Sequence, residues 1–136
     1  MKELQVDATL ENLEAVQNFV SGVLEENDCP MKAQIQIEVA VEELYVNIAH
    51  YAYGEGCGSA VIQVEISGEP KTAHITFIDS GTPYDPLAKA DPDVSLSAEK
   101  REIGGLGIFI VKKSMDDMQY EYKDGQNRLT IIKKIG

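Results

Sequence analysis

Two neighbouring segments in the middle of the chain alternate apolar and polar residues, and they constrain the fold more than any other feature. Residues 60–66 read AVIQVEI and residues 73–79 read AHITFID. A period of two is typical of strands with one buried and one exposed face. The turn SGEPK at 67–71 joins them into a hairpin. The rest of the chain must therefore cover one face of an antiparallel sheet.

Helical segments before and after the hairpin can supply that cover. Apolar residues recur at helical spacing through 10–26, 31–52 and 106–115. In the second of these, the apolar residues cover more than one stripe of the helix surface, which predicts a largely buried helix; they are Ile35, Val39, Leu44, Val46, Ile48 and Ala49. Further strands are expected at 2–6, 118–122 and 128–135. These elements predict an α+β two-layer sandwich, in which helices cover one face of a mainly antiparallel sheet.

The charge balance narrows the classes of partner. Twelve Lys and Arg against 23 Asp and Glu give a net charge of −11. Nucleic acids and anionic membrane surfaces are bound by clustered basic residues, so we expect neither as a partner.

The length of the chain, its apolar runs and its cysteines indicate how many domains it forms and in which cellular compartment we expect it. We expect residues 1–136 to form a single domain. No apolar run approaches the roughly 20 residues that span a bilayer, and no signal peptide is visible. Cys29 and Cys57 lack CxxC spacing and predict free thiols in a reducing compartment. We therefore expect a cytoplasmic protein.

The first motif ends the second helix, where residues 42–54 read EELYVNIAHYAYG. Glu43 and Asn47 are four residues apart and share a helix face, and His50 follows on the same side. A glutamate can take up a proton, and an amide oxygen is a ligand suited to Mg²⁺. A solvated polar stripe on the helix explains the same spacing, so this motif alone does not establish a binding or catalytic site.

The second motif ends the hairpin, where residues 78–86 read IDSGTPYDP. The Asp79 carboxylate can accept a hydrogen bond from an exocyclic amine such as that of adenine. Gly81 would let a flat ring approach the backbone. An ordinary turn capped by Asp79 is the alternative.

The third motif, GGLGIFIV at 104–111, brings glycines into the start of an apolar helix. Free amides and the helix dipole at such a start suit phosphate oxygens, although a flexible hinge explains the glycines too. The spacing is neither the Walker nor the Rossmann pattern. The long polar segment before it, 82–104, is typical of a functional lid.

Taken in chain order, the three motifs resemble the ATP-binding domain of the GHKL superfamily, which includes gyrase, Hsp90, MutL proteins and histidine kinases. The E-x-x-x-N motif resembles its N box, the D-x-G motif its first glycine box, and the G-x-G motif its second. The likeness spans roughly residues 35–134. Within the superfamily, the chain is most similar to the small bacterial anti-sigma-factor serine/threonine kinases. The resemblance implies the Bergerat ATP-binding fold.

The resemblance implies roles for the residues of the first two motifs. Glu43 would be the general base, and Asn47 would hold Mg²⁺ at the ATP phosphates. His50 would face phosphate. Asp79 would accept a hydrogen bond from the adenine amino group, with Gly81 beside the ring.

It also implies roles for four residues further along the chain. Gly105 and Gly107 would place their amides against phosphates. Arg101, in the lid, would neutralise charge on the γ-phosphate. Thr130, in the last strand, would lie near adenine.

The function implied by the resemblance is that of an ATP-dependent serine/threonine kinase that also acts as an anti-sigma factor. It would phosphorylate a STAS-type anti-anti-sigma partner, hold a sigma factor inactive, and form a homodimer. One alternative is a nucleotide-gated binding module with little or no phosphoryl transfer. Another is an ATP hydrolase with water as the nucleophile, although such relatives couple hydrolysis to further domains.

Overall fold

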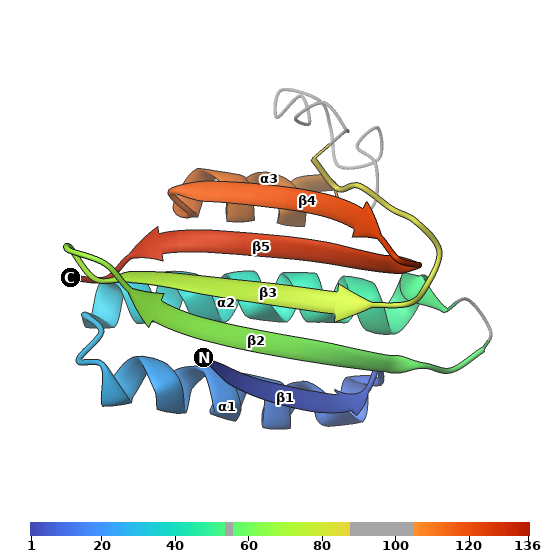
Figure 1. The fold of residues 1–136 in the computed structure, drawn as a ribbon, viewed down its shortest axis with the longest axis horizontal. Helices are drawn as coiled ribbons and strands as arrows, with labels where there is room; N and C mark the ends of the chain where they lie inside the picture. Colours follow the sequence, from blue (N-terminus) through green and yellow to red (C-terminus); the bar gives the residue numbers. More distant parts are fainter. Residues whose placement is uncertain (54–55, 88–104) are drawn as a thin grey trace.

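A computed structural model describes residues 1–53, 56–87 and 105–136, with only the backbone described at 105 and 106. Five antiparallel strands form one sheet in the order β1-β2-β3-β5-β4. The three α-helices of the described residues cover one face of that sheet (Figure 1). The expected α+β two-layer fold is confirmed.

The elements follow the sequence pattern closely. The helix expected through 31–52 ends in a π-helical turn, and the hairpin strands lie where the alternation placed them. In chain order the elements are β1 (Lys2–Asp7), the 3-10 turn η1 (Leu10–Asn12), α1 (Leu13–Glu26), α2 (Met31–Asn47), the π-helical turn η2 (Ile48–Ala52), β2 (Ser59–Ser67), β3 (Thr72–Asp79), α3 (Gly105–Ser114), β4 (Asp117–Lys123) and β5 (Gln126–Lys134).

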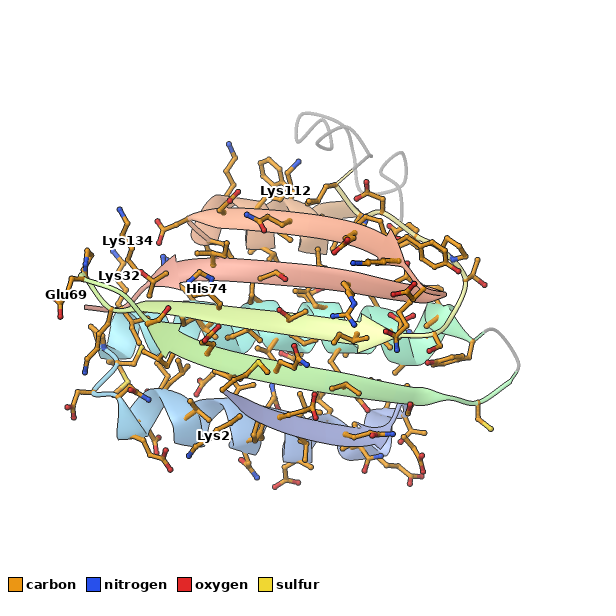
Figure 2. All side chains as sticks on the ribbon, in the orientation of Figure 1. Lys2, Lys32, Glu69, His74, Lys112 and Lys134 are labelled. Carbon is orange, nitrogen blue, oxygen red and sulfur yellow. The ribbon has the colours of Figure 1, made fainter. Side chains whose placement is uncertain are left out.

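The register of the hairpin sets which strand residues enter the core. Ile62 pairs with Phe77 and Val64 with Ile75, and all four are at most 1% exposed. Because side chains alternate across a strand, the intervening polar residues point to the open face. His74, labelled in the middle of that face, is one of them (Figure 2).

The helices lie side by side behind the sheet, with α1 near β1 and α3 behind β4 (Figure 1). Helix α2 runs between them and contributes most to the core. Its buried residues recur at three- and four-residue spacing, as expected for a helix that packs by one face. They are Ala33, Ile37, Ala40, Val41, Leu44 and Tyr45.

One expectation about α2 is wrong. Ile35 and Val39 are 51% and 42% exposed, respectively. The helix has neighbours on its sheet side and its flanks, so its outer side faces solvent. The apolar residues on that side are not part of the core.

Tyr45 connects α2 to the first strand. Its side chain is fully buried, and its hydroxyl lies 2.6 Å from the carbonyl oxygen of Thr9 and 3.0 Å from that of Asp7. The amide of Thr9 donates to the same hydroxyl. Burial raises the pKa of the Tyr45 hydroxyl, and the Asp7 carboxylate adds to the rise. The protonated hydroxyl thus holds the segment between β1 and η1 against the helix.

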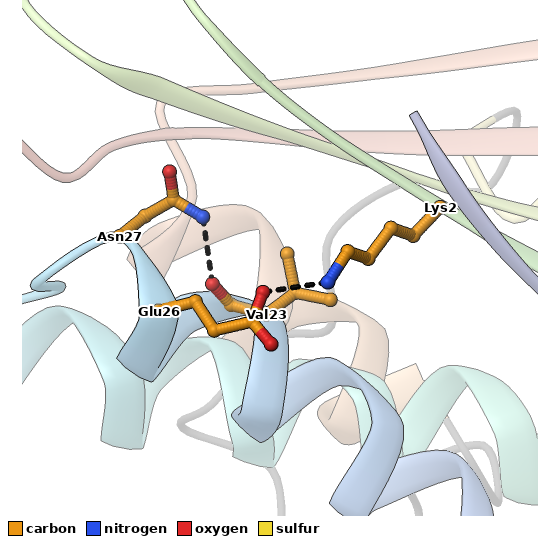
Figure 3. Close-up of polar contacts among 4 residues, drawn as sticks. All are labelled: Lys2, Val23, Glu26 and Asn27. Atoms are coloured by element: carbon orange, nitrogen blue, oxygen red, sulfur yellow. Dashed lines mark hydrogen bonds and ion pairs between the residues drawn. The ribbon is translucent and has the colours of Figure 1, made fainter.

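The end of α1 is fixed by two polar contacts (Figure 3). Asn27 donates its side-chain amide to the carbonyl of Val23, and Lys2 pairs with Glu26 at 2.6 Å. The two ionic side chains are more than half exposed, so this pair contributes at most about 1 kcal/mol.

Two further expectations concern cysteines and membranes. Cys29 and Cys57 are both free thiols, as expected. Within the described ranges, no helix has the length and apolar character needed to cross a membrane.

Candidate functional site

A pocket of about 510 Å³ opens where β3 ends, β5 begins and α2 gives way to its π-helical turn. Its walls are mainly apolar, with a few polar groups among them. Such a composition is typical of sites that bind an organic molecule. The described residues that line it are Leu44, Asn47, Ile48, Tyr51, Ala52, Phe77, Asp79, Thr82, Pro83, Tyr84, Pro86, Ile108, Tyr120, Asn127 and Leu129.

Asp79 is the acidic group among the described residues that line this pocket. It is the last residue of β3 and only 7% exposed. Its Oδ1 accepts hydrogen bonds from the amide of Gly81 at 2.9 Å and from Nδ2 of Asn127 at 3.0 Å. No described residue donates to Oδ2, and no fully buried side-chain oxygen of the described ranges lacks a partner. Oδ2 is therefore open to the pocket and can accept a hydrogen bond from a ligand.

Asn127 is the second buried polar residue of the site, and it lies outside the three sequence motifs. It stands opposite Asp79 in the β3–β5 register and is 6% exposed. Its Nδ2 also donates to the carbonyl of Thr82 at 3.0 Å, and its Oδ1 accepts from the amide of Tyr84 at 3.1 Å. The alternation in β5 held a signal for it, because Asn127 shares a face with buried Leu129.

Tyr120, on the edge strand β4, completes this network. Its hydroxyl donates to Oδ1 of Asn127. Burial raises the pKa of that hydroxyl, and the carboxylates of Asp85 and Asp79 add to the rise. The hydroxyl thus remains protonated and available as a donor at neutral pH.

Gly81 is needed for a packing reason that is separate from the expected position beside the ring. A Cβ placed on it would lie 2.1 Å from the carbonyl oxygen of Ala52, at the end of η2. The next amide, that of Thr82, donates to the same oxygen at 2.8 Å. The glycine is required because the chain after β3 packs directly on the end of the helix. This close packing places Thr82 in the pocket wall.

The other end of the site joins α2 to α3. Asn47 lines the pocket, and Glu43 lies one turn earlier on α2. A Cβ on Gly107 would lie 2.2 Å from Oε2 of Glu43, so the carboxylate rests against the first turn of α3. Among the described residues, that carboxylate makes no hydrogen bond or ion pair. The structure therefore brings the first and third motifs together, with Gly105 as the first residue of α3.

Thr130 is not brought to the pocket, and we correct that expectation. Its hydroxyl lies 2.9 Å from the hydroxyl of Thr76, a residue of β3. Alternation along β5 places Thr130 on the opposite face of the sheet from Leu129, which lines the pocket. The β5 residue that contacts Asp79 is Asn127 instead.

Two other expected residues do not contribute to the described walls. His50 is exposed, and its ring packs edge-on against that of Tyr51, with centroids 5.8 Å apart. Arg101, with most of the expected lid at 82–104, lies outside the described residues; the described part of that segment ends at residue 87.

These groups suit a nucleotide, with a base at the Asp79 end and phosphates near the start of α3. The open carboxylate oxygen can accept from an amine, and apolar walls such as Phe77 and Leu129 can enclose a ring. The lining residues that the structure describes include no Lys or Arg. In the described ranges, no group of three or more His, Cys, Asp or Glu residues is placed so that it could hold a metal ion. Asn47 offers this end of the pocket an amide oxygen, a ligand suited to Mg²⁺.

Comparison with known proteins finds similarity over nearly the whole chain. A model of the histidine kinase-like ATPase domain matches residues 6–133. The serine-protein kinase RsbW of Listeria monocytogenes is 28% identical over 127 residues, which cover 90% of this chain and 80% of that protein. The anti-sigma F factor of Pasteuria penetrans is 24% identical over 134 residues, which cover 98% and 89%, respectively.

A solved structure has the same fold. The crystal structure of the RsbU and RsbW domains of Rv1364c from Mycobacterium tuberculosis matches with a TM-score of 0.66 at 14% identity. The match covers 99% of this chain and 33% of that one. At this identity the likeness concerns the fold alone.

Proposed function

Because the chain belongs to the histidine kinase-like ATPase domain family, we propose that it binds ATP in this pocket and phosphorylates a serine or threonine of a protein partner. The observation that carries the proposal is the buried carboxylate of Asp79, whose Oδ2 is open to a largely apolar pocket. A carboxylate in that position selects a ligand that has a hydrogen-bond donor on a flat apolar body. The amino-substituted ring of adenine fits this description.

The proposed phosphate end lies between α2 and α3. Glu43 lies against Gly107, and backbone amides at the start of α3 are suited to phosphate oxygens. Asn47 would hold Mg²⁺, which would offset the charge of the phosphates. Arg101 and His50 remain proposals as further phosphate contacts.

The proposed reaction is a direct transfer. Glu43 accepts the proton of the partner's hydroxyl as that oxygen forms its bond to the γ-phosphorus. The bond between the γ-phosphorus and the β,γ-bridging oxygen breaks, and ADP leaves with that electron pair. Glu43 suits the role of base because no described residue competes for its carboxylate.

We propose a STAS-type anti-anti-sigma protein as the phosphorylated partner and a sigma factor as the protein held inactive. The kinase and anti-sigma factor names of the relatives support this part of the proposal. A homodimer, a single domain over residues 1–136 and a cytoplasmic location, where sigma factors act, belong to the same proposal.

The test is transfer of labelled phosphate from ATP to a purified STAS-type partner. We expect Glu43→Gln to reduce transfer by about 100-fold or more, the usual scale for loss of a general base. Glu42→Gln is the matched control. Glu42 is the exposed neighbour on another side of the helix, and its replacement should leave transfer unchanged.

The outcomes separate the proposed functions. Full activity of Glu43→Gln would exclude Glu43 as the base. Tight ATP binding without any labelled partner would favour the nucleotide-gated binding module. Release of labelled phosphate to water at the same rate with and without the partner would favour an ATP hydrolase.

A further inference from the structure

We propose that Asn127 is the positioning residue that makes the Asp79 end of the pocket select an amino-substituted purine over a keto-substituted one. The inference rests on the proposed ATP-binding function and adds to it a residue outside the three sequence motifs. It assigns a selective role to the buried Asp79–Asn127 pair and to the backbone segment 82–84 that Asn127 holds.

Asn127 has little freedom to turn. Both polar atoms of its side-chain amide make hydrogen bonds. Nδ2 donates to Asp79 Oδ1 and to the Thr82 carbonyl. Oδ1 accepts from the Tyr84 amide and from the Tyr120 hydroxyl. A flipped amide would place its oxygen against the Asp79 carboxylate and the Thr82 carbonyl, which are acceptors, and its NH₂ group against the Tyr84 amide, which can only donate. The network therefore fixes which end of the amide meets Asp79.

This orientation decides which oxygen of Asp79 faces the ligand. Oδ1 receives two donors, one from Gly81 and one from Asn127, and is directed away from the ligand. Oδ2 remains as an acceptor at the pocket surface. It attracts the exocyclic amine of adenine and repels the keto oxygen at the same place in hypoxanthine.

Asn127 also fixes the wall beside that oxygen. Thr82 and Tyr84, which it holds through their backbones, both line the pocket together with Pro83. Loss of the amide would release the carboxylate and the wall together. A rotated Asp79 in a looser pocket would no longer distinguish the two purines.

The experiment measures dissociation constants for ATP and ITP, which differ at this purine position. For the wild-type protein we expect ATP to bind at least about tenfold more tightly, the scale of a hydrogen bond to a charged group. Asn127→Leu is a replacement of similar size without polar atoms. In this variant the ratio of the ITP to the ATP dissociation constant should fall to about one. Tyr120→Phe removes one of the side-chain hydrogen bonds of Asn127, and the ratio of the ITP to the ATP dissociation constant should fall by roughly threefold.

Thr76→Val is the matched control. It removes a side-chain hydrogen bond of similar length from the same pair of strands, but on the open face of the sheet. In this variant the ratio of the ITP to the ATP dissociation constant should equal that of the wild type, even if the protein is less stable.

Each outcome bears on the inference. If the wild type binds neither nucleotide, the proposed function fails. If the wild type prefers ATP and Asn127→Leu weakens both nucleotides equally, Asn127 has only a structural role and the inference is overturned. If circular dichroism shows that Asn127→Leu does not fold, Tyr120→Phe provides the test. A Tyr120→Phe protein whose ratio of ITP to ATP dissociation constants equals that of the wild type would contradict the inference.

Discussion

At the scale of single residues, two glycines of the site are needed for different physical reasons. A Cβ on Gly81 would meet backbone, the carbonyl of Ala52, whereas a Cβ on Gly107 would meet the far end of the Glu43 side chain. Backbone at the end of a helix cannot move cheaply, but a carboxylate can turn aside. The first glycine therefore serves stability and the second serves the position of the proposed base.

This difference predicts that two similar substitutions affect the free energy of unfolding to different extents. Gly81→Ala should lower the free energy of unfolding by about 1–3 kcal/mol, the usual cost of overpacking. Gly107→Ala should change it by no more than about 1 kcal/mol, because alanine favours the helix. Phosphoryl transfer by Gly107→Ala should nevertheless fall, since Glu43 is displaced. Urea unfolding and the transfer assay measure both effects, and an equal loss of stability in the two variants would contradict the account.

Residue patterns predicted the carboxylate of the site but not its partner. The D-x-G motif offers Asp79 as a candidate, and the family resemblance assigns it to adenine. The family resemblance places Thr130 near adenine, although the alternation of β5 puts it on the open face. The same alternation places Asn127 on the pocket face. The role of Asn127 depends on the β3–β5 register, which joins residues 48 apart in the sequence.

At the scale of elements, Tyr45 is the main polar link between α2 and the first strand. Tyr45→Phe should lower the free energy of unfolding by about 1–3 kcal/mol, because the polar groups around the hydroxyl lose their partner. Urea unfolding at neutral pH measures the loss. A variant as stable as the wild type would show that the contacts with Asp7 and Thr9 contribute nothing.

The same residue predicts a dependence on alkaline pH. Because the folded protein raises the pKa of Tyr45, the stabilising effect is complete below the ordinary tyrosine value of about 10 and is lost as the pH rises through the higher folded value. Tyr45→Phe should therefore lose less stability than the wild type between neutral pH and pH 11. Parallel losses in the two proteins would contradict this assignment, since Tyr120 titrates in both.

The two cysteines provide a probe of the helix layer. Burial, reinforced by the Glu38 carboxylate, raises the pKa of the Cys29 thiol, whereas Cys57 is exposed. At pH 8 a thiol reagent should therefore modify Cys57 faster than Cys29, because the thiolate is the reactive form. Mass spectrometry of the labelled protein shows the order, and faster labelling of Cys29 would contradict the packing described here.

Local periodicity predicted most elements because their patterns are strong. It failed at Ile35 and Val39, where apolar residue type suggested burial and the position on α2 gives exposure. A helix in the middle of a single layer has one face without neighbours, and the sequence of that helix alone does not show which face it is.

At the scale of the whole molecule, the pocket is made from parts of the chain that only the fold unites. The end of α2, the ends of β3 and β5, the strand β4 and the start of α3 all contribute to it or border it. Charged residues such as Lys32, Glu69 and Lys134 lie at the other end of the molecule (Figure 2). The family resemblance predicted this assembly, whereas hydrophobic patterning alone predicted only the two layers.

The most direct test of the central claim is the affinity of the folded protein for ATP in the presence of Mg²⁺, compared between wild type and Asp79→Asn by calorimetric titration. Asp124→Asn is the charge-matched control. Asp124 has a positive φ of 54° in the β4–β5 turn, a conformation that asparagine accepts readily. We predict that the wild type and the control bind ATP equally and that Asp79→Asn binds at least about tenfold more weakly. Equal binding by all three proteins would contradict the account.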